Sequence, residues 1–181
     1  PDNSAARQLR RDLLSAASKL NHPALLGPHI LSLREWLRQF LPEDIQLCDD
    51  QSRELQLIEA LLERGDLLGG ANPWALAENL LQLFDELTLN QLKLPETLED
   101  FSQQLARAYQ LIDTSLAPFS HEAKIVHTLW QAWQQQLRDN QQIDSSMAYL
   151  LCLHEALKQL TSQSLYLAGY DFLSRGEQNW L

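Results

Sequence analysis

NPWALAENLLQLFDEL, residues 72–87, has apolar side chains at the three- and four-residue spacing that places them on one face of an α-helix. Asn72 is a favourable N-cap, and Pro73 suits the first helical position because the N–H that it lacks would have no partner there. The stretch therefore predicts an amphipathic helix. The same spacing recurs in both directions and predicts further helices over residues 3–20, 33–41, 50–64, 97–116, 120–138 and 145–160.

The composition agrees with this helical spacing. Leucine makes up about a fifth of the chain, whereas valine and isoleucine together number about seven, and β-branched residues are the ones that favour strands. Pro42 and Pro118 are expected to end the helices that precede them. Leu165-Tyr166-Leu167 alone has the character of a strand. We therefore expect a mostly α fold, a multi-helix bundle of about seven helices with one short terminal β-strand.

The size and apolar content of the chain indicate a folded protein outside the membrane. It has 181 residues, of which 45% are hydrophobic, enough for one domain with a core. Its apolar runs are far shorter than the roughly 20 residues that cross a bilayer, so no membrane partner is expected. Cys48 and Cys152 lie far apart without metal-binding spacing, which favours buried free thiols in a reducing, cytoplasmic setting.

Charge is unevenly distributed along the chain. Residues 1–40 hold six Lys/Arg and three Asp/Glu, whereas the remaining 141 residues hold eight and 21. The net charge of −10 argues against a domain that binds nucleic acid by bulk electrostatics. Residues 1–40 nevertheless carry a net positive charge, and the rest of the chain carries a net negative charge.

The residue types that carry catalysis form no recognisable pattern. His121-Glu122 begins like a zinc-protease motif, but Ile125 occupies the place of the second histidine. The stretch from Gly65 to Gly70 has no phosphate-binding lysine and predicts a helix end followed by a turn. We expect no metal, no cofactor and no catalytic site in this chain, and we expect acidic pairs such as Asp49-Asp50 to be helix-start or surface charges.

Aromatic and histidine side chains are expected to pack rather than to bind a ligand. His127 and His154 lie beside apolar helix faces, which favours partly buried, hydrogen-bonded imidazoles. Packing is also favoured over stacking on nucleobases for four tryptophans at core-facing positions. These are Trp36, Trp74, Trp130 and Trp133.

Two stretches near the N-terminus resemble motifs of UvrD-like superfamily I helicases. Residues 2–10, DNSAARQLR, resemble motif Ia, TNxAAxEL(R), the turn and helix that follow a strand of the first RecA-like domain. Residues 29–37, HILSLREWL, resemble the next motif, TxHSxxxxxL, which touches single-stranded DNA, although Leu31 replaces its histidine. The resemblance implies DNA contacts at Asn3, Ser4, Arg7, His29, Ser32 and Arg34. Helix capping and solvated charge are an equally good explanation of these side chains.

A third stretch occupies the place of motif II in that family. Residues 165–172 are LYLAGYDF, and Ala168 and Gly169 stand where the family has Asp-Glu. Without these acids no side chain holds Mg²⁺ or orients the attacking water, so ATP hydrolysis is not expected. This degenerate motif resembles the AddB/RexB-like subunits, inactivated superfamily I helicases that carry a PD-(D/E)XK nuclease domain further along the chain.

The resemblance implies three parts within an excerpt of a longer protein. Residues 1–41 would belong to the RecA-like subdomain 1A, residues 42–160 to a helical insertion like subdomain 1B, and residues 161–181 to the degenerate motif II strand and turn. The implied function is a non-catalytic share in DNA double-strand-break repair and recombination. The implied partners are single-stranded or duplex DNA and a helicase–nuclease partner subunit, and exposed apolar surface makes a homodimer of the excerpt a further candidate.

An alternative explanation is a self-contained acidic helical domain that binds or regulates another protein. The abrupt N-terminal start and the lone terminal strand count against it. The two explanations predict different ligands. The first predicts DNA binding that weakens steeply with salt, and the second predicts salt-insensitive binding to a protein.

Overall fold

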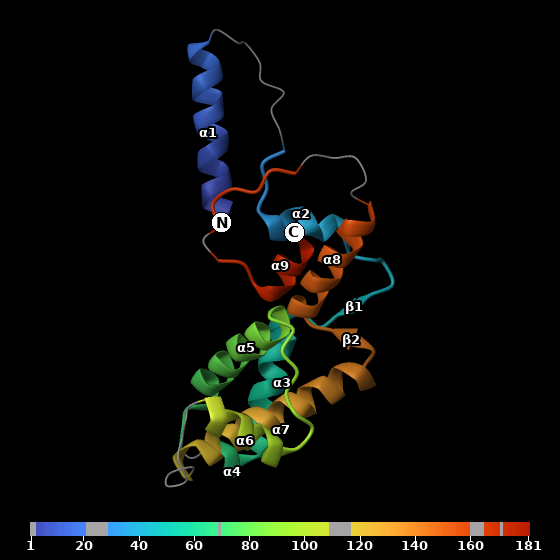
Figure 1. Cartoon of the computed structure of the whole chain (residues 1–181). Helices are drawn as coiled ribbons and strands as arrows, with labels where there is room; N and C mark the ends of the chain where they lie inside the picture. The colour runs from blue at the N-terminus through green and yellow to red at the C-terminus, as the bar shows by residue number, and fades with distance from the viewer. Residues whose placement is uncertain (1–2, 21–28, 69, 109–116, 160–164, 171) are drawn as a thin grey trace. The chain divides into compact units, whose positions relative to one another are not determined.

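A computed structural model describes residues 3–20, 29–68, 70–108, 117–159, 165–170 and 172–181 (Figure 1). These residues are mostly helical, as the sequence predicts. No helix within these ranges is long and apolar enough to cross a membrane. The chain divides into two compact units, which we call the central unit, residues 43–148, and the terminal unit, residues 1–42 with 149–181.

The central unit contains the longer helices and a small sheet. In chain order its described elements are β1 (Gln46–Leu47), α3 (Asp50–Glu63), α4 (Gly65–Leu68), α5 (Pro73–Leu89), α6 (Leu98–Ala108), α7 (Ala117–Asp139) and β2 (Gln142–Ile143). The first turn of α8 (Ser145–Gln159) also belongs to this unit.

Side-chain caps fix where three of these helices begin, and the cap at Asn72 was predicted. Asp49 accepts the backbone N–H of Ser52 at 2.9 Å in front of α3. Asn72 accepts the N–H of Trp74 at 2.9 Å in front of α5. Asp144 accepts the N–H of residue 147 at 2.8 Å in front of α8. Each cap satisfies an amide that has no partner inside its helix.

The core of the central unit lies between α3, α5 and α7. Leu61, Ala77 and Phe84 are completely buried, and the Phe84 ring meets Trp130 edge-on with 5.1 Å between centroids. Burying one large apolar side chain stabilises a fold by about 1.5–3 kcal/mol, so this cluster is the main source of the unit's stability. Its other buried members are Cys48, Leu57, Ile58, Leu80, Leu87, Ile125, Leu129, Trp133 and Leu137.

The two strands pair in parallel and join the segment before α3 to the segment after α7. Gln46 lies opposite Gln142, and Leu47 lies opposite Ile143. The N–H of Cys48 donates to the carbonyl of Ile143 at 2.9 Å. Two-residue strands are too short to show an alternating pattern, so the sequence did not predict this sheet.

The terminal unit combines elements from both ends of the chain. They are α1 (Asn3–Lys19), α2 (Leu33–Leu37), the short 3-10 helix η1 (Arg38–Phe40), α8 from Tyr149 onward, and α9 (Arg175–Trp180). The Trp36 ring lies 4.8 Å from that of Phe40 and 6.1 Å from that of Trp180. Buried side chains of this unit include Leu33, Leu37, Cys152, Leu153, Ala156 and Trp180.

The predicted terminal strand does not form. Residues 165–167 are neither helix nor strand, and among the described residues the paired strands are β1 and β2. Leu165 and Tyr166 are 41% and 91% exposed. A strand needs a neighbour to bond its backbone groups, and apolar composition alone does not supply one.

Three helix boundaries also differ from the prediction. Pro118 lies in the first turn of α7 instead of ending a helix, because proline is tolerated where the N–H has no intrahelical acceptor. Gly65–Leu68 forms α4 where a turn was predicted, with Gly70 at a left-handed φ of +86° after it. The helix predicted over residues 97–116 is described as Leu98–Ala108, and residues 109–116 lie outside the described ranges.

The burial predictions are partly confirmed. His127 is buried, and its Nε2 hydrogen-bonds the Pro95 carbonyl at 2.9 Å, whereas His154 is exposed. Trp130 and Trp133 are buried and Trp36 is half-buried, whereas Trp74 is 55% exposed. Both cysteines are buried and free, as expected.

Candidate functional site

The first group of predicted DNA-contacting residues lies at the start of α1. The helix begins at Asn3, and Ser4 and Arg7 follow within its first two turns. Arg7 is exposed, as is Arg11 one turn later on the same face. The start of α1 therefore combines the positive end of a 17-residue helix with exposed guanidinium groups.

The second group surrounds the start of α2. His29 is exposed and precedes the helix in irregular backbone. Ser32 is the N-cap of α2, and its Oγ accepts the N–H of Glu35 at 3.2 Å. The guanidinium of Arg34 lies 5.3 Å from the centroid of the Tyr149 ring. Ser32 and Arg34 thus have structural roles within the terminal unit, in keeping with capping as one explanation of these residues.

One hydrogen bond links the two groups. Arg10 of α1 donates from Nη2 to the backbone carbonyl of Ile30. Ile30 lies next to His29 and two residues before Ser32. The structure therefore brings α1 and the segment before α2 together, through an arginine that the sequence reasoning did not single out.

The degenerate motif II positions lie in irregular backbone. Ala168 and Gly169 are exposed, and Gly169 has a φ of +77°, the left-handed conformation that favours glycine. Neither residue has a side chain that can bind a metal ion or orient water.

A carboxylate at the start of α9 organises the other end of the terminal unit. Glu177 Oε2 accepts the N–H and the hydroxyl of Ser174 at 2.7 and 2.8 Å, completing a capping box. Glu177 Oε1 accepts the hydroxyl of Tyr149 at 2.6 Å. Burial and this hydrogen bond raise the pKa of Tyr149 far above its ordinary value. The contact ties α8 to α9.

A buried arginine joins three segments of the central unit. Arg53 is 2% exposed, and its Nη1 lies 2.6 Å from Asp85 Oδ1, which also accepts the Ser146 hydroxyl at 2.7 Å. Nη2 lies 3.8 Å from Asp144 Oδ2, beyond hydrogen-bond distance. The guanidinium also lies 5.6 Å from the centroid of the Trp133 ring. This cluster links α3, α5 and the start of α8 in the interior.

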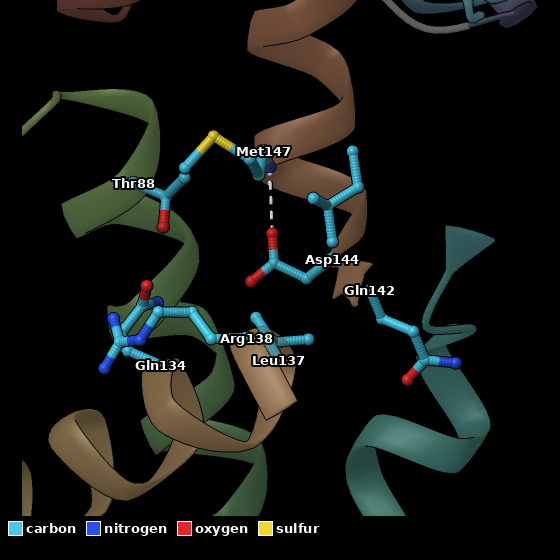
Figure 2. A pocket seen from close by; sticks show the side chains of 8 residues that line it. Thr88, Gln134, Leu137, Arg138, Gln142, Asp144 and Met147 are labelled. Carbon is cyan, nitrogen blue, oxygen red and sulfur yellow. Dashed lines mark hydrogen bonds between the residues drawn. The ribbon is translucent and has the colours of Figure 1, made fainter. Parts of the chain in front are cut away.

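A pocket of about 160 Å³ lies beside this cluster (Figure 2). Asp144 is the acid that lines it, but Oδ1 accepts the Met147 N–H and Oδ2 accepts the Trp133 indole N–H at 3.3 Å. Both carboxylate oxygens are therefore already engaged within the protein. The pocket is lined by Thr88, Gln134, Leu137, Arg138, Gln142, Ile143, Asp144 and Met147.

No catalytic arrangement is evident in the parts of the chain that the structure describes. In those parts, no three His, Cys, Asp or Glu side chains come close enough to hold a metal ion. Burial raises the pKa of the Cys48 thiol and of the Cys152 thiol, which favours the unreactive protonated form of both. The best candidate surface is therefore the basic face at the start of α1.

The buried cluster around Arg53 was not predicted, although the sequence pattern contained a hint of it. Arg53 precedes Leu57 and Leu61 at four-residue spacing, so it shares their inward face. Leu55 and Leu62 lie on the other side of the helix and are 52% and 59% exposed. An arginine on an apolar face, with acids predicted on neighbouring helices, indicates a buried ion pair.

Comparison of the chain with models of protein families, with curated proteins and with solved structures finds no match.

Proposed function

We propose that this chain is a non-catalytic part of an inactivated superfamily I helicase–nuclease subunit, and that its terminal unit binds DNA during double-strand-break repair and recombination. The observation that carries the proposal is the discontinuity of the terminal unit. Residues 1–42 and 149–181 form one compact unit, and residues 43–148 form a helical unit inserted between them. A helical insertion between motif-bearing segments is the organisation that the resemblance to these helicases predicts.

Side chains that precede the insertion contact side chains that follow it, which supports one discontinuous terminal unit. Trp36 near the N-terminal end packs against Trp180 near the C-terminal end. Arg34 lies over the ring of Tyr149, whose hydroxyl in turn donates to Glu177. Side chains of the second motif-bearing segment, residues 29–37, therefore contact side chains that follow the insertion.

The distribution of charge favours the terminal unit as the DNA-binding part. The central unit carries 18 Asp/Glu against six Lys/Arg, and such a surface repels phosphates. The helix α1 has the opposite balance, with Asp12 as its one acidic residue against four basic ones. Cations together with a helix N-terminus are the groups that hold phosphate oxygens.

The proposal assigns no ATP hydrolysis to the motif II segment. Ala168 and Gly169 supply no carboxylate for Mg²⁺ or for the attacking water. The role of this chain would then be to position DNA, or to contact the partner subunit.

Fluorescence anisotropy with labelled single-stranded and duplex oligonucleotides tests the proposal. Binding should weaken steeply as salt rises, and Arg7→Ala should reduce the slope of log affinity against log salt by about one. Arg138→Ala removes one exposed cation from the central unit. It should leave the affinity for the oligonucleotide and the salt slope nearly unchanged. Absence of binding at low salt, or an equal effect of the two variants, would contradict the proposal.

A self-contained protein-interaction domain is the alternative, and one observation favours it. Tyr166 and Phe172 are 91% and 94% exposed, and large exposed aromatic side chains are typical of protein-binding surfaces. The same anisotropy experiment separates the two functions, because this alternative predicts no binding of oligonucleotides even at low salt.

A further inference from the structure

We propose that the pocket of the central unit binds a pyrimidine nucleobase. The pocket has a volume of about 160 Å³, and all of its lining residues belong to the central unit. Its walls come from α5, α7, β2 and the segment at the start of α8. Three properties of these walls identify the ligand, namely their unpaired polar groups, the size of the space between them and their charge.

Two polar side chains of the pocket have no partner inside the described parts of the protein. Thr88 of α5 is 7% exposed, and Gln134 of α7 is half-buried. Among the described residues, the side-chain hydrogen bonds nearest to them in the chain come from Asn90, Trp133 and Gln135 and involve neither the Thr88 hydroxyl nor the Gln134 amide. In Figure 2 the Thr88 hydroxyl points toward the side of the pocket where Gln134 lies. Because burying a hydroxyl without a hydrogen bond destabilises a fold, an unpaired hydroxyl that faces a pocket indicates a ligand.

The size and apolar lining of the pocket favour a single ring. A cavity of about 150 Å³ holds one benzene-sized ring, so a pocket of about 160 Å³ suits one six-membered ring better than the fused rings of a purine. Leu137, Ile143 and Met147 form the apolar part of the lining. A sugar would leave hydroxyl groups unpaired against these side chains, which disfavours it.

The charges around the pocket favour a neutral ligand. Asp144 lines the pocket, but its two carboxylate oxygens already accept the N–H groups of Met147 and Trp133, so it has no oxygen left for a cationic ligand. Arg138 is exposed and donates from Nη2 to Gln135 Oε1 at 2.8 Å. The excess of 18 Asp/Glu over six Lys/Arg in the central unit disfavours an anionic ligand.

A pyrimidine base has the polar edge that the two unpaired groups require. In uracil an N–H donor lies beside a carbonyl acceptor, and the Gln134 amide has an acceptor and a donor side by side. Glutamine recognises adenine through the same kind of paired hydrogen bonds. The Thr88 hydroxyl can donate to a carbonyl oxygen of the base, while the apolar side chains pack against its ring. One ligand thus satisfies both unpaired groups.

Saturation-transfer NMR and calorimetric titration of the full chain with uracil, without DNA, test this inference independently of the proposed function. Uracil should bind with a Kd of about 1 mM or below, as expected for so small a ligand. Benzene has the ring size without the polar edge, and adenine has a polar edge on a larger fused ring. Each should bind at least about fivefold more weakly than uracil.

Two variants test which side chains hold the base. Thr88→Val removes the hydroxyl and keeps the shape of the side chain, and Gln134→Leu removes the amide. Each should weaken uracil binding about three- to tenfold. Thr88→Val should not lower the midpoint of thermal unfolding, because the hydroxyl has no partner to lose. Gln82→Leu is the matched control, since Gln82 is exposed on α5 and does not line the pocket.

Several outcomes would overturn the inference. They are a wild-type chain that does not bind uracil at millimolar concentration, binding of benzene or adenine that is as tight as that of uracil, and a loss of affinity in Gln82→Leu that equals the loss in Gln134→Leu.

Discussion

Arg53 and Asp85 form an ion pair between α3 and α5, with 2.6 Å between Nη1 and Oδ1. The arginine side chain is 3% exposed, whereas that of Asp85 is 36% exposed. Arg53 Nε and Nη2 are buried without a hydrogen-bond partner, so the pair leaves part of the guanidinium unsatisfied. The charge of Arg53 is therefore balanced by two carboxylates together, those of Asp85 and Asp144.

Asp144→Ala should destabilise the protein strongly. The substitution removes the cap of α8 and the acceptor of the Trp133 indole, and it leaves Arg53 with a single carboxylate partner. Loss of a helix cap costs about 1 kcal/mol and a buried donor left without an acceptor about 1–3 kcal/mol, so the free energy of unfolding measured by urea denaturation should fall by about 2–4 kcal/mol. Asp66→Ala removes an exposed partner of Arg64 and should cost far less, because solvent screens exposed ion pairs. Equal costs for the two variants would show that the buried cluster is not formed.

Leu61→Ala should destabilise the central unit through a cavity in its core. Leu61 is fully buried, and leucine-to-alanine changes at such sites cost about 2–5 kcal/mol. Leu92→Ala serves as the control. Leu92 is 49% exposed, so this substitution should lower the free energy of unfolding by only a few tenths of a kcal/mol. Thermal or urea unfolding monitored by circular dichroism gives both values, and a small loss for Leu61→Ala would refute the placement of α3.

Tyr149 should make the stability of the protein depend on alkaline pH. Its pKa is raised in the folded state, so the folded protein holds the phenolic proton more tightly than the unfolded chain does. The resulting stabilisation is complete below the ordinary pKa of 10.0 and is lost as the pH rises above it. Tyr149→Phe should flatten this part of the curve of unfolding free energy against pH.

Tyr166→Phe provides the matched control for that experiment, since Tyr166 is 91% exposed. Its curve should follow that of the wild-type chain at every pH. A Tyr149→Phe curve that also follows the wild type would mean that the bond from Tyr149 to Glu177 does not form.

Much of the helical architecture could be predicted from local chemistry. Caps such as Asp49 and Asn72 act on amides two or three residues away, so the sequence contains all that is needed to place the helix start. The short sheet and the buried cluster depend on residues far apart in the chain. Arg53 and Asp85 are 32 positions apart, and no local sequence pattern predicts that their helices are in contact.

The candidate site was harder to predict than the fold. Ser32 caps a helix and Arg34 lies over an aromatic ring, and both are ordinary structural roles for residue types that also contact DNA. The strand expected at Leu165-Tyr166-Leu167 shows the same limit, because a strand is defined by its neighbour as much as by its own side chains.

Hydrogen–deuterium exchange of the full chain, with and without a saturating single-stranded oligonucleotide, tests the central claim most directly. If the terminal unit binds DNA, the amides of residues 3–20 and 29–38 should gain protection, whereas those of the central unit should not change. Protection confined to residues 43–148, or no change at any residue, would contradict the claim.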